Sequence, residues 1–249
     1  MRDVLSIAKY EYKMQIRNKA FWIVLLFASI FSIWEQFPSN ENLRRLGGLT
    51  DHSYIASRSL TLMGVFLMFG CVFLIGNRIN IDIKKKISEV LFSTPISKAS
   101  YICGKFFGNY LVSLTIGTIF VVINGVTQAL FNPAPFEIVP YILSIIFIVI
   151  PSMLFVVSLS LAIPVLIDIR LLYASFSVYF MYCIIAIPDS YELPFYWIIG
   201  DTRKLVYSVD GFPIPYQSAL LNIIFLIGVG MLSLLLLGLK RCFWRGNCD

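Results

Sequence analysis

Long windows without charged residues constrain this chain most, since ~20 mostly apolar residues are enough to cross a bilayer as a helix. Six windows in the 249-residue sequence reach or approach that length. They predict membrane spans at about 20–36, 59–77, 106–130, 139–167, 171–188 and 218–239. The third and fourth windows are separated by Asn132-Pro133-Ala134-Pro135, a strong turn signal. The whole chain, 1–249, is therefore predicted to be one all-α integral membrane domain.

The composition agrees with this class. Hydrophobic residues make up 58% of the chain and charged residues 14%, which excludes a soluble globular or a disordered protein. The first apolar window follows five basic residues and precedes no small-x-small cleavage site, so we expect a membrane span there rather than a signal peptide.

The basic residues predict the orientation. With six spans, the N-terminus, the 77–105 loop, the 168–170 turn and the C-terminus share one side and carry 15 of the 20 Lys and Arg residues. The positive-inside rule places that side in the cytoplasm. We therefore expect a multi-pass protein of the cytoplasmic membrane with both termini inside. The net charge of +6 divides into +9 inside and −3 outside, so it indicates orientation and not nucleic-acid binding.

Catalytic motifs are missing from the sequence. There is one histidine, His52, and no GxSxG, HExxH, CxxC or GxxxxGK[ST] motif. We therefore expect no enzyme and no cofactor in this chain, so any ATP and Mg²⁺ would bind a partner. Apart from Glu35 at the end of the first, the predicted spans hold no ionisable residue except cysteine and tyrosine, which argues against an ion-coupled carrier. Asn124 and Gln128, one turn apart, are predicted either to bond neighbouring helices or to line a substrate path.

Two segments on the predicted cytoplasmic side favour structured elements. The spacing of apolar and basic residues in 1–19 predicts an amphipathic helix at the membrane interface, where its basic residues would meet lipid headgroups; a plain positive-inside anchor is the alternative. In the 78–105 coupling loop, Ile83, Ile87 and Leu91 predict a short helix near 80–92.

The second helix of this loop is predicted from a capping pattern. The first helix should stop before Pro95, because the residue preceding a proline avoids the α conformation. Thr94 as N-cap and Pro95 at the first helical position then predict a new helix that runs into the third span. The triple Lys84-Lys85-Lys86 is either part of a docking surface or a solvated charge run.

The segment 87–108 resembles the first cytoplasmic loop of type-2 permeases of ABC transporters. The shared pattern consists of Glu89, Leu91, Pro95-Ile96-Ser97 and Gly104-Lys105. The N-terminal pattern of Glu11, Arg17-Asn18-Lys19 and Phe21-Trp22 is also similar to that class. Singly these motifs are degenerate, and together they are moderately specific.

The resemblance implies a dimer of permease subunits, identical or related, which binds two cytosolic ABC ATPase subunits. It implies that the helix between spans two and three docks on the ATPase, with Lys85, Ile87, Glu89, Leu91 and Pro95 as coupling residues. Glu89 would then dock or position a helix and would not be a catalyst. The helix at 1–19 would also contact the ATPase.

The 189–218 segment is too long for a plain connection and is rich in aromatic residues, which suit a membrane–water boundary. We expect short re-entrant or interfacial helices there, with an ordinary surface loop as the alternative. The leading function is a permease subunit that exports an amphipathic or hydrophobic cargo, with peptide or bacteriocin export or immunity ranked before drug or lipid. The alternatives are a non-transporting membrane anchor or regulator and, less favoured, a membrane enzyme.

Overall fold

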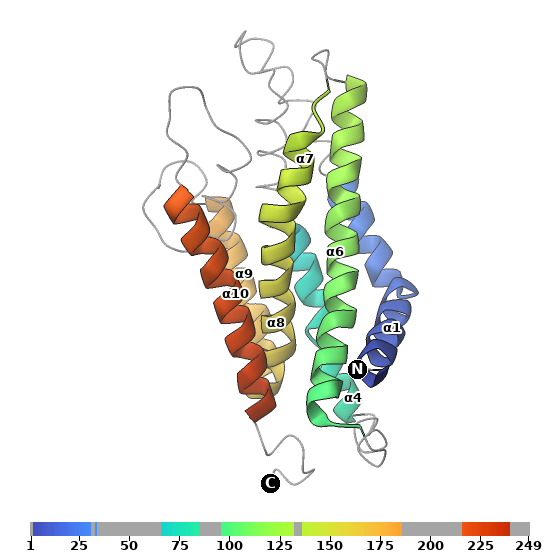
Figure 1. The fold of residues 1–249 in the computed structure, drawn as a ribbon, viewed down its shortest axis with the longest axis vertical. Helices are drawn as coiled ribbons and strands as arrows, with labels where there is room; N and C mark the ends of the chain where they lie inside the picture. Colours follow the sequence, from blue (N-terminus) through green and yellow to red (C-terminus); the bar gives the residue numbers. More distant parts are fainter. Residues whose placement is uncertain are drawn as a thin grey trace.

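The computed structural model describes residues 2–30, 33, 66–84, 96–131, 136–185 and 216–239. Every regular element within these ranges is a helix (Figure 1). The predicted all-helical class is therefore confirmed for the part of the chain that the structure describes. The apolar sequence windows explain this result, because a segment inside lipid must satisfy its own backbone hydrogen bonds.

Three helices are long and apolar enough to cross a membrane. The first is α6 (Lys98–Phe131) and the last is α10 (Tyr216–Leu239). The middle one runs without a break over Val139–Leu166; it consists of α7 (Val139–Ser144), a π-helical turn (Ile145–Val149) and α8 (Ile150–Leu166). These three helices coincide with the third, fourth and sixth predicted spans.

Three further helices lie in the other predicted spans. They are the segments Lys19–Ile30 and Phe66–Ile75 and the helix α9 (Ile169–Ile185). Each is shorter than a full membrane crossing within the described residues. The structure therefore supports a membrane protein with at least three candidate spans, and the six-span layout stays a prediction.

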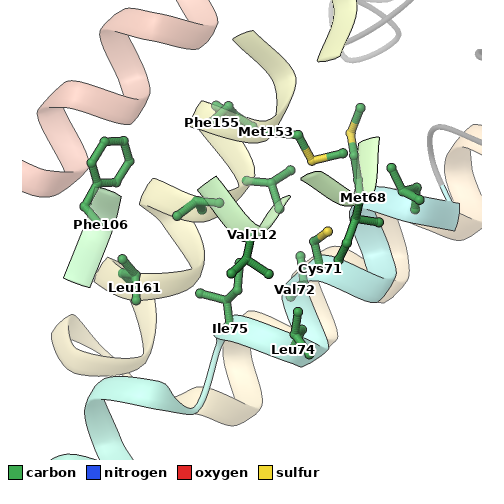
Figure 2. Packing of buried hydrophobic residues seen from close by; sticks show 14 of the residues in the cluster. Met68, Cys71, Val72, Leu74, Ile75, Phe106, Val112, Met153, Phe155 and Leu161 are labelled. Atoms are coloured by element: carbon green, nitrogen blue, oxygen red, sulfur yellow. The ribbon is translucent and has the colours of Figure 1, made fainter. Parts of the chain in front are cut away.

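The α8 helix is central to the packing, with α10, α6 and α9 against it (Figure 1). The buried core lies where α6 meets α8 and the Phe66–Ile75 helix. Val112 of α6 points toward Val72 and Ile75 in that core, and Met153 of α8 lies close by (Figure 2). Side chains on the outer faces of α10 and α6, such as Leu235 and Val126, are exposed and apolar, as a lipid-facing surface requires.

The predicted N-terminal amphipathic helix is present as α1 (Arg2–Ile16). It lies along the beginning of α6 (Figure 1). Its buried face carries Ala8, Glu11 and Gln15, whereas Leu5 and Tyr10 are exposed on the other side. Two of the three buried residues are polar, so α1 buries more than an apolar stripe.

The start of α6 differs from the prediction. Ile96 and Ser97 are not helical, and α6 begins at Lys98. The Ser97 hydroxyl accepts a hydrogen bond from the Ser100 amide at 3.1 Å, which is the geometry of an N-cap. The predicted helix start at Thr94-Pro95 is therefore wrong, because a better-placed serine caps the helix further along the chain.

Only the beginning of the predicted 80–92 helix is described. The helix α4 covers Arg78–Lys84. The remainder of that prediction lies outside the described residues, as do the predicted elements at 189–218.

Candidate functional site

A group of polar side chains is buried where α1, α4 and the beginning of α6 meet. We call it the polar junction. All of its members are buried except Arg78, which is partly buried. It comprises Glu11 and Gln15 of α1, Arg78 and Asp82 of α4, and Tyr101, Lys105 and Asn109 of α6.

Lys105 is the centre of the polar junction. Its ammonium group donates to the carboxylate of Glu11 and lies 2.5 Å from that of Asp82. The Tyr101 hydroxyl donates a second hydrogen bond to the same Asp82 carboxylate, at 2.8 Å. One cation from α6 therefore holds a carboxylate from each of the two other helices. Because all three charges are buried, removal of any one leaves its partners uncompensated.

A chain of hydrogen bonds continues this contact from α4 through α1 to α6. The Arg78 guanidinium donates to the Gln15 side-chain oxygen at 2.6 Å, and the Gln15 amide donates to Asn109 at 2.8 Å. Asn109 in turn donates to the backbone carbonyl of Lys105 at 2.8 Å. Each amide uses both its donor and its acceptor, so the chain fixes the three helices relative to one another.

The charges in the polar junction balance, with two carboxylates, one ammonium and one guanidinium. Burial lowers the pKa of Arg78 below its ordinary value, and the charges of Glu11 and Asp82 act in the opposite direction. Arg78 therefore interacts electrostatically with both carboxylates, while its hydrogen bond goes to Gln15.

Two glycines of α6 allow α1 to approach closely enough for these contacts. A Cβ atom at Gly104 would lie 2.6 Å from the Ile7 Cβ, and one at Gly108 would lie 2.8 Å from the Ala8 carbonyl oxygen. The spacing of Gly104 and Gly108 is that of the small-xxx-small pattern, which brings helix backbones together in membranes. In the Gly104-Lys105 pair, the glycine thus lets α1 come close to α6, and the lysine is the cation that this contact buries.

The helix that carries the third predicted span is longer than the sequence predicted, and it includes Lys105. The third span was expected to start after Lys105 and to hold no ionisable residue except cysteine and tyrosine. Because α6 begins earlier, Lys105 lies inside the long helix and is only 4% exposed. A charged residue inside a candidate span is costly and is a default indication of function.

The sequence did contain a signal for the polar junction. Glu11 and Gln15 share the apolar stripe of α1 with Ala8. Polar residues within an otherwise buried stripe predict a polar partner on the facing helix. Asp82 and Arg78 gave no comparable signal, because they belong to a charge-rich segment whose buried side is set by the tertiary fold.

The coupling residues predicted from the sequence, Lys85, Ile87, Glu89, Leu91 and Pro95, lie outside the described residues. Asn124 and Gln128 are described, and both are buried on α6, far along the helix from the polar junction. Among the described residues, the side-chain amide of Gln128 has no hydrogen-bond partner for either its oxygen or its nitrogen. Both interpretations of Asn124 and Gln128, a bond to a neighbouring helix and a substrate path, stay predictions.

Among the residues that the structure describes, no three His, Cys, Asp or Glu side chains are grouped so that they could hold a metal ion. The chemistry of the polar junction is that of a buried ion-pair network, in which the Glu11 Oε2 atom has no hydrogen-bond partner among the described residues. No protein-family model matches the sequence, and no curated protein matches it significantly.

Proposed function

We propose that the chain is the permease subunit of an ABC transporter, which moves an amphipathic or hydrophobic cargo across the cytoplasmic membrane. In this proposal the energy comes from ATP hydrolysed by separate partner subunits, and two permease subunits form the path. The motifs around Glu89 and Gly104-Lys105 support the proposal, together with three helices that are long and apolar enough to span a membrane.

The observation that carries the proposal is the polar junction. A transporter driven from outside its membrane domain needs stiff elements through which the motor can act on the spans. In this chain α1 and α4 belong to the two segments that would meet the motor, and buried ion pairs tie both to α6 through Lys105. A push on α4 would therefore reach α6 without being lost in a flexible loop.

The cargo is proposed from the surface chemistry. Within 106–131 of α6 and 138–167 of the next span there is no charged residue. A path lined by these two segments would favour an uncharged or amphipathic cargo. We rank a hydrophobic peptide, such as a bacteriocin, before a drug or a lipid.

The proposal is tested by purifying the tagged chain from its native membrane in a mild detergent. We expect a vanadate-sensitive ATPase with a phosphate-binding loop to co-purify at a defined stoichiometry. Glu89→Gln should reduce this association or uncouple the hydrolysis. The matched control is Glu137→Gln. Glu137 is exposed just before the start of α7, at the opposite end of α6 from the polar junction.

Any one of three results would contradict the proposal: purification of the chain without an ATPase, an associated protein that hydrolyses no ATP, or equal effects of the two glutamate variants. Binding of a cytosolic protein that has no nucleotide site would favour the membrane anchor or regulator instead.

A further inference from the structure

A second buried polar site lies at the opposite end of α6 from the polar junction. Both polar atoms of the Gln128 side chain are buried and have no hydrogen-bond partner among the described residues. The hydroxyl of Tyr141, on α7, is likewise buried without a partner in the part of the chain that the structure describes. A buried amide or hydroxyl without a partner costs about 1–3 kcal/mol, so native structures keep few such groups.

Gly125 places these two side chains close to each other. The ring of Tyr141 lies 3.5–3.7 Å from the position that a Cβ of Gly125 would take. Gln128 follows Gly125 by one turn of the same helix, so the Tyr141 ring packs within a turn of the Gln128 side chain. The two unpartnered groups thus come from facing helices, with Tyr141 against Gly125 and Gln128 one turn further along α6.

The backbone beside Tyr141 is irregular. The π-helical turn Ile145–Val149 begins one turn after Tyr141, and π-helical turns often mark functional sites. Pro151 explains it locally, because proline lacks the amide that would bond the carbonyl of Phe147 in a regular α-helix. The distorted turn therefore follows Tyr141 by one turn of its own helix, and its last residue, Val149, faces Gly117 of α6.

We propose that Gln128 and Tyr141 form a binding site for an uncharged amide group of the cargo, of the kind that a peptide backbone offers. An amide both donates and accepts, as the two atoms of the Gln128 side chain require. A charged ligand is disfavoured because 106–131 and 138–167 contain no charged residue. This site deepens the proposed function and rests on it for the identity of the ligand as cargo.

The test uses the full chain in lipid nanodiscs and two small compounds of nearly equal shape. N-butylbutanamide carries the amide, and butyl butanoate replaces its N–H by an oxygen that cannot donate. A ligand that binds the folded protein raises the midpoint of thermal unfolding. We expect the amide to raise the midpoint several-fold more than the ester does.

Three variants assign the effect to the site. Gln128→Leu should abolish the difference between the amide and the ester, and Tyr141→Phe should reduce it. Tyr110→Phe is the matched control, because the Tyr110 hydroxyl already donates to the Ile150 carbonyl at 3.1 Å; it should keep the difference intact.

Equal shifts by amide and ester in the wild-type chain would overturn the proposal, since that is the result if only water enters the site or if both compounds merely partition into lipid. A difference that survives Gln128→Leu and Tyr141→Phe would also overturn it. If Gln128→Leu fails to fold, Tyr141→Phe alone decides. The test involves neither ATP nor an ATPase, so a negative result leaves the co-purification experiment unaffected.

Discussion

The two ends of α6 treat their buried polar side chains in opposite ways. At the first end, Lys105 pairs with carboxylates of α1 and α4, and Asn109 bonds to Gln15 of α1 and to the Lys105 carbonyl of its own helix. At the other end, Gln128 is equally buried, and its side chain has no hydrogen-bond partner among the described residues. The same helix therefore carries one polar site in which only the Glu11 Oε2 atom lacks a partner and one whose amide has none within the described chain.

This difference indicates different roles for the two sites. A buried ion-pair network holds helices in one arrangement, because any displacement leaves a charge without its partner. An unpartnered amide destabilises the resting chain and gains its bonds only when another molecule arrives. We therefore interpret the polar junction as the rigid part of the domain and the Gln128 region as the part that receives a ligand.

The largest effect is expected from the centre of the polar junction. Lys105→Met removes the cation that Glu11 and Asp82 share and should lower the free energy of unfolding by about 3–5 kcal/mol. Thermal unfolding in detergent measures this loss. Lys98→Met is the control, because Lys98 is exposed at the start of the same helix. Equal midpoints for the two variants would show that the junction is not structural.

The close approach of α1 can be broken without touching a polar group. Gly108→Ala would place a methyl group 2.6 Å from the Glu11 Cβ and should cost about 1–3 kcal/mol, since α1 must move away. Relative to the wild-type chain, amide hydrogen exchange in this variant should increase more in α1 than in α8.

Gly228→Ala is the matched control for this change, because no described atom outside the local backbone of its own helix lies within 4 Å of the Cβ position at Gly228. Its effect should be neutral or slightly stabilising, because alanine is the better helix former. A similar loss in both variants would mean that α1 does not depend on the small side chain of Gly108.

The sequence predicted the helices far better than their ends. Charge-free windows placed α6, α8 and α10 because a membrane requires long apolar helices. The start of α6 was missed, because the capping pattern at Thr94-Pro95 looked stronger than the serine that caps the helix, Ser97. The choice between two adequate caps depends on where α1 and α4 pack, which local sequence does not contain.

The candidate site was predictable only in part. Glu11 and Gly104-Lys105 were recognised as a pattern, but their mutual contact depends on how α1 packs along the beginning of α6. Asn124 and Gln128 were noticed as the main polar pair of the third predicted span. The sequence could not separate Asn109, which has hydrogen-bond partners, from Gln128, which has none among the described residues, because that difference depends on the facing helix.

A smaller effect should separate hydrogen bonding from charge within the polar junction. Tyr101→Phe removes the hydroxyl that donates to Asp82 but keeps the ring next to Lys105. Because a hydrogen bond to a charged group contributes about 1.5–3 kcal/mol at most, we expect a loss near the lower limit while Lys105 still pairs with Asp82. Thermal unfolding is compared with that of Tyr10→Phe, whose side chain is exposed on α1; equal unfolding midpoints for the two variants would mean that Lys105 alone stabilises the Asp82 carboxylate.

The smallest expected effect separates the two ends of α6 most sharply. The change in the free energy of unfolding should have opposite signs for the same substitution at the two ends. Asn109→Leu removes a bonded amide, leaves Gln15 without an acceptor and should lower the stability. Gln128→Leu removes an amide that has no partner, so in the absence of ligand it should raise the free energy of unfolding by about 1 kcal/mol. Both changes replace a buried amide by leucine on one helix, and both are read from the same unfolding midpoint. If Gln128→Leu is destabilising to the same degree as Asn109→Leu, the Gln128 amide is already satisfied in the membrane, and the contrast between a rigid end and a receptive end of α6 is lost.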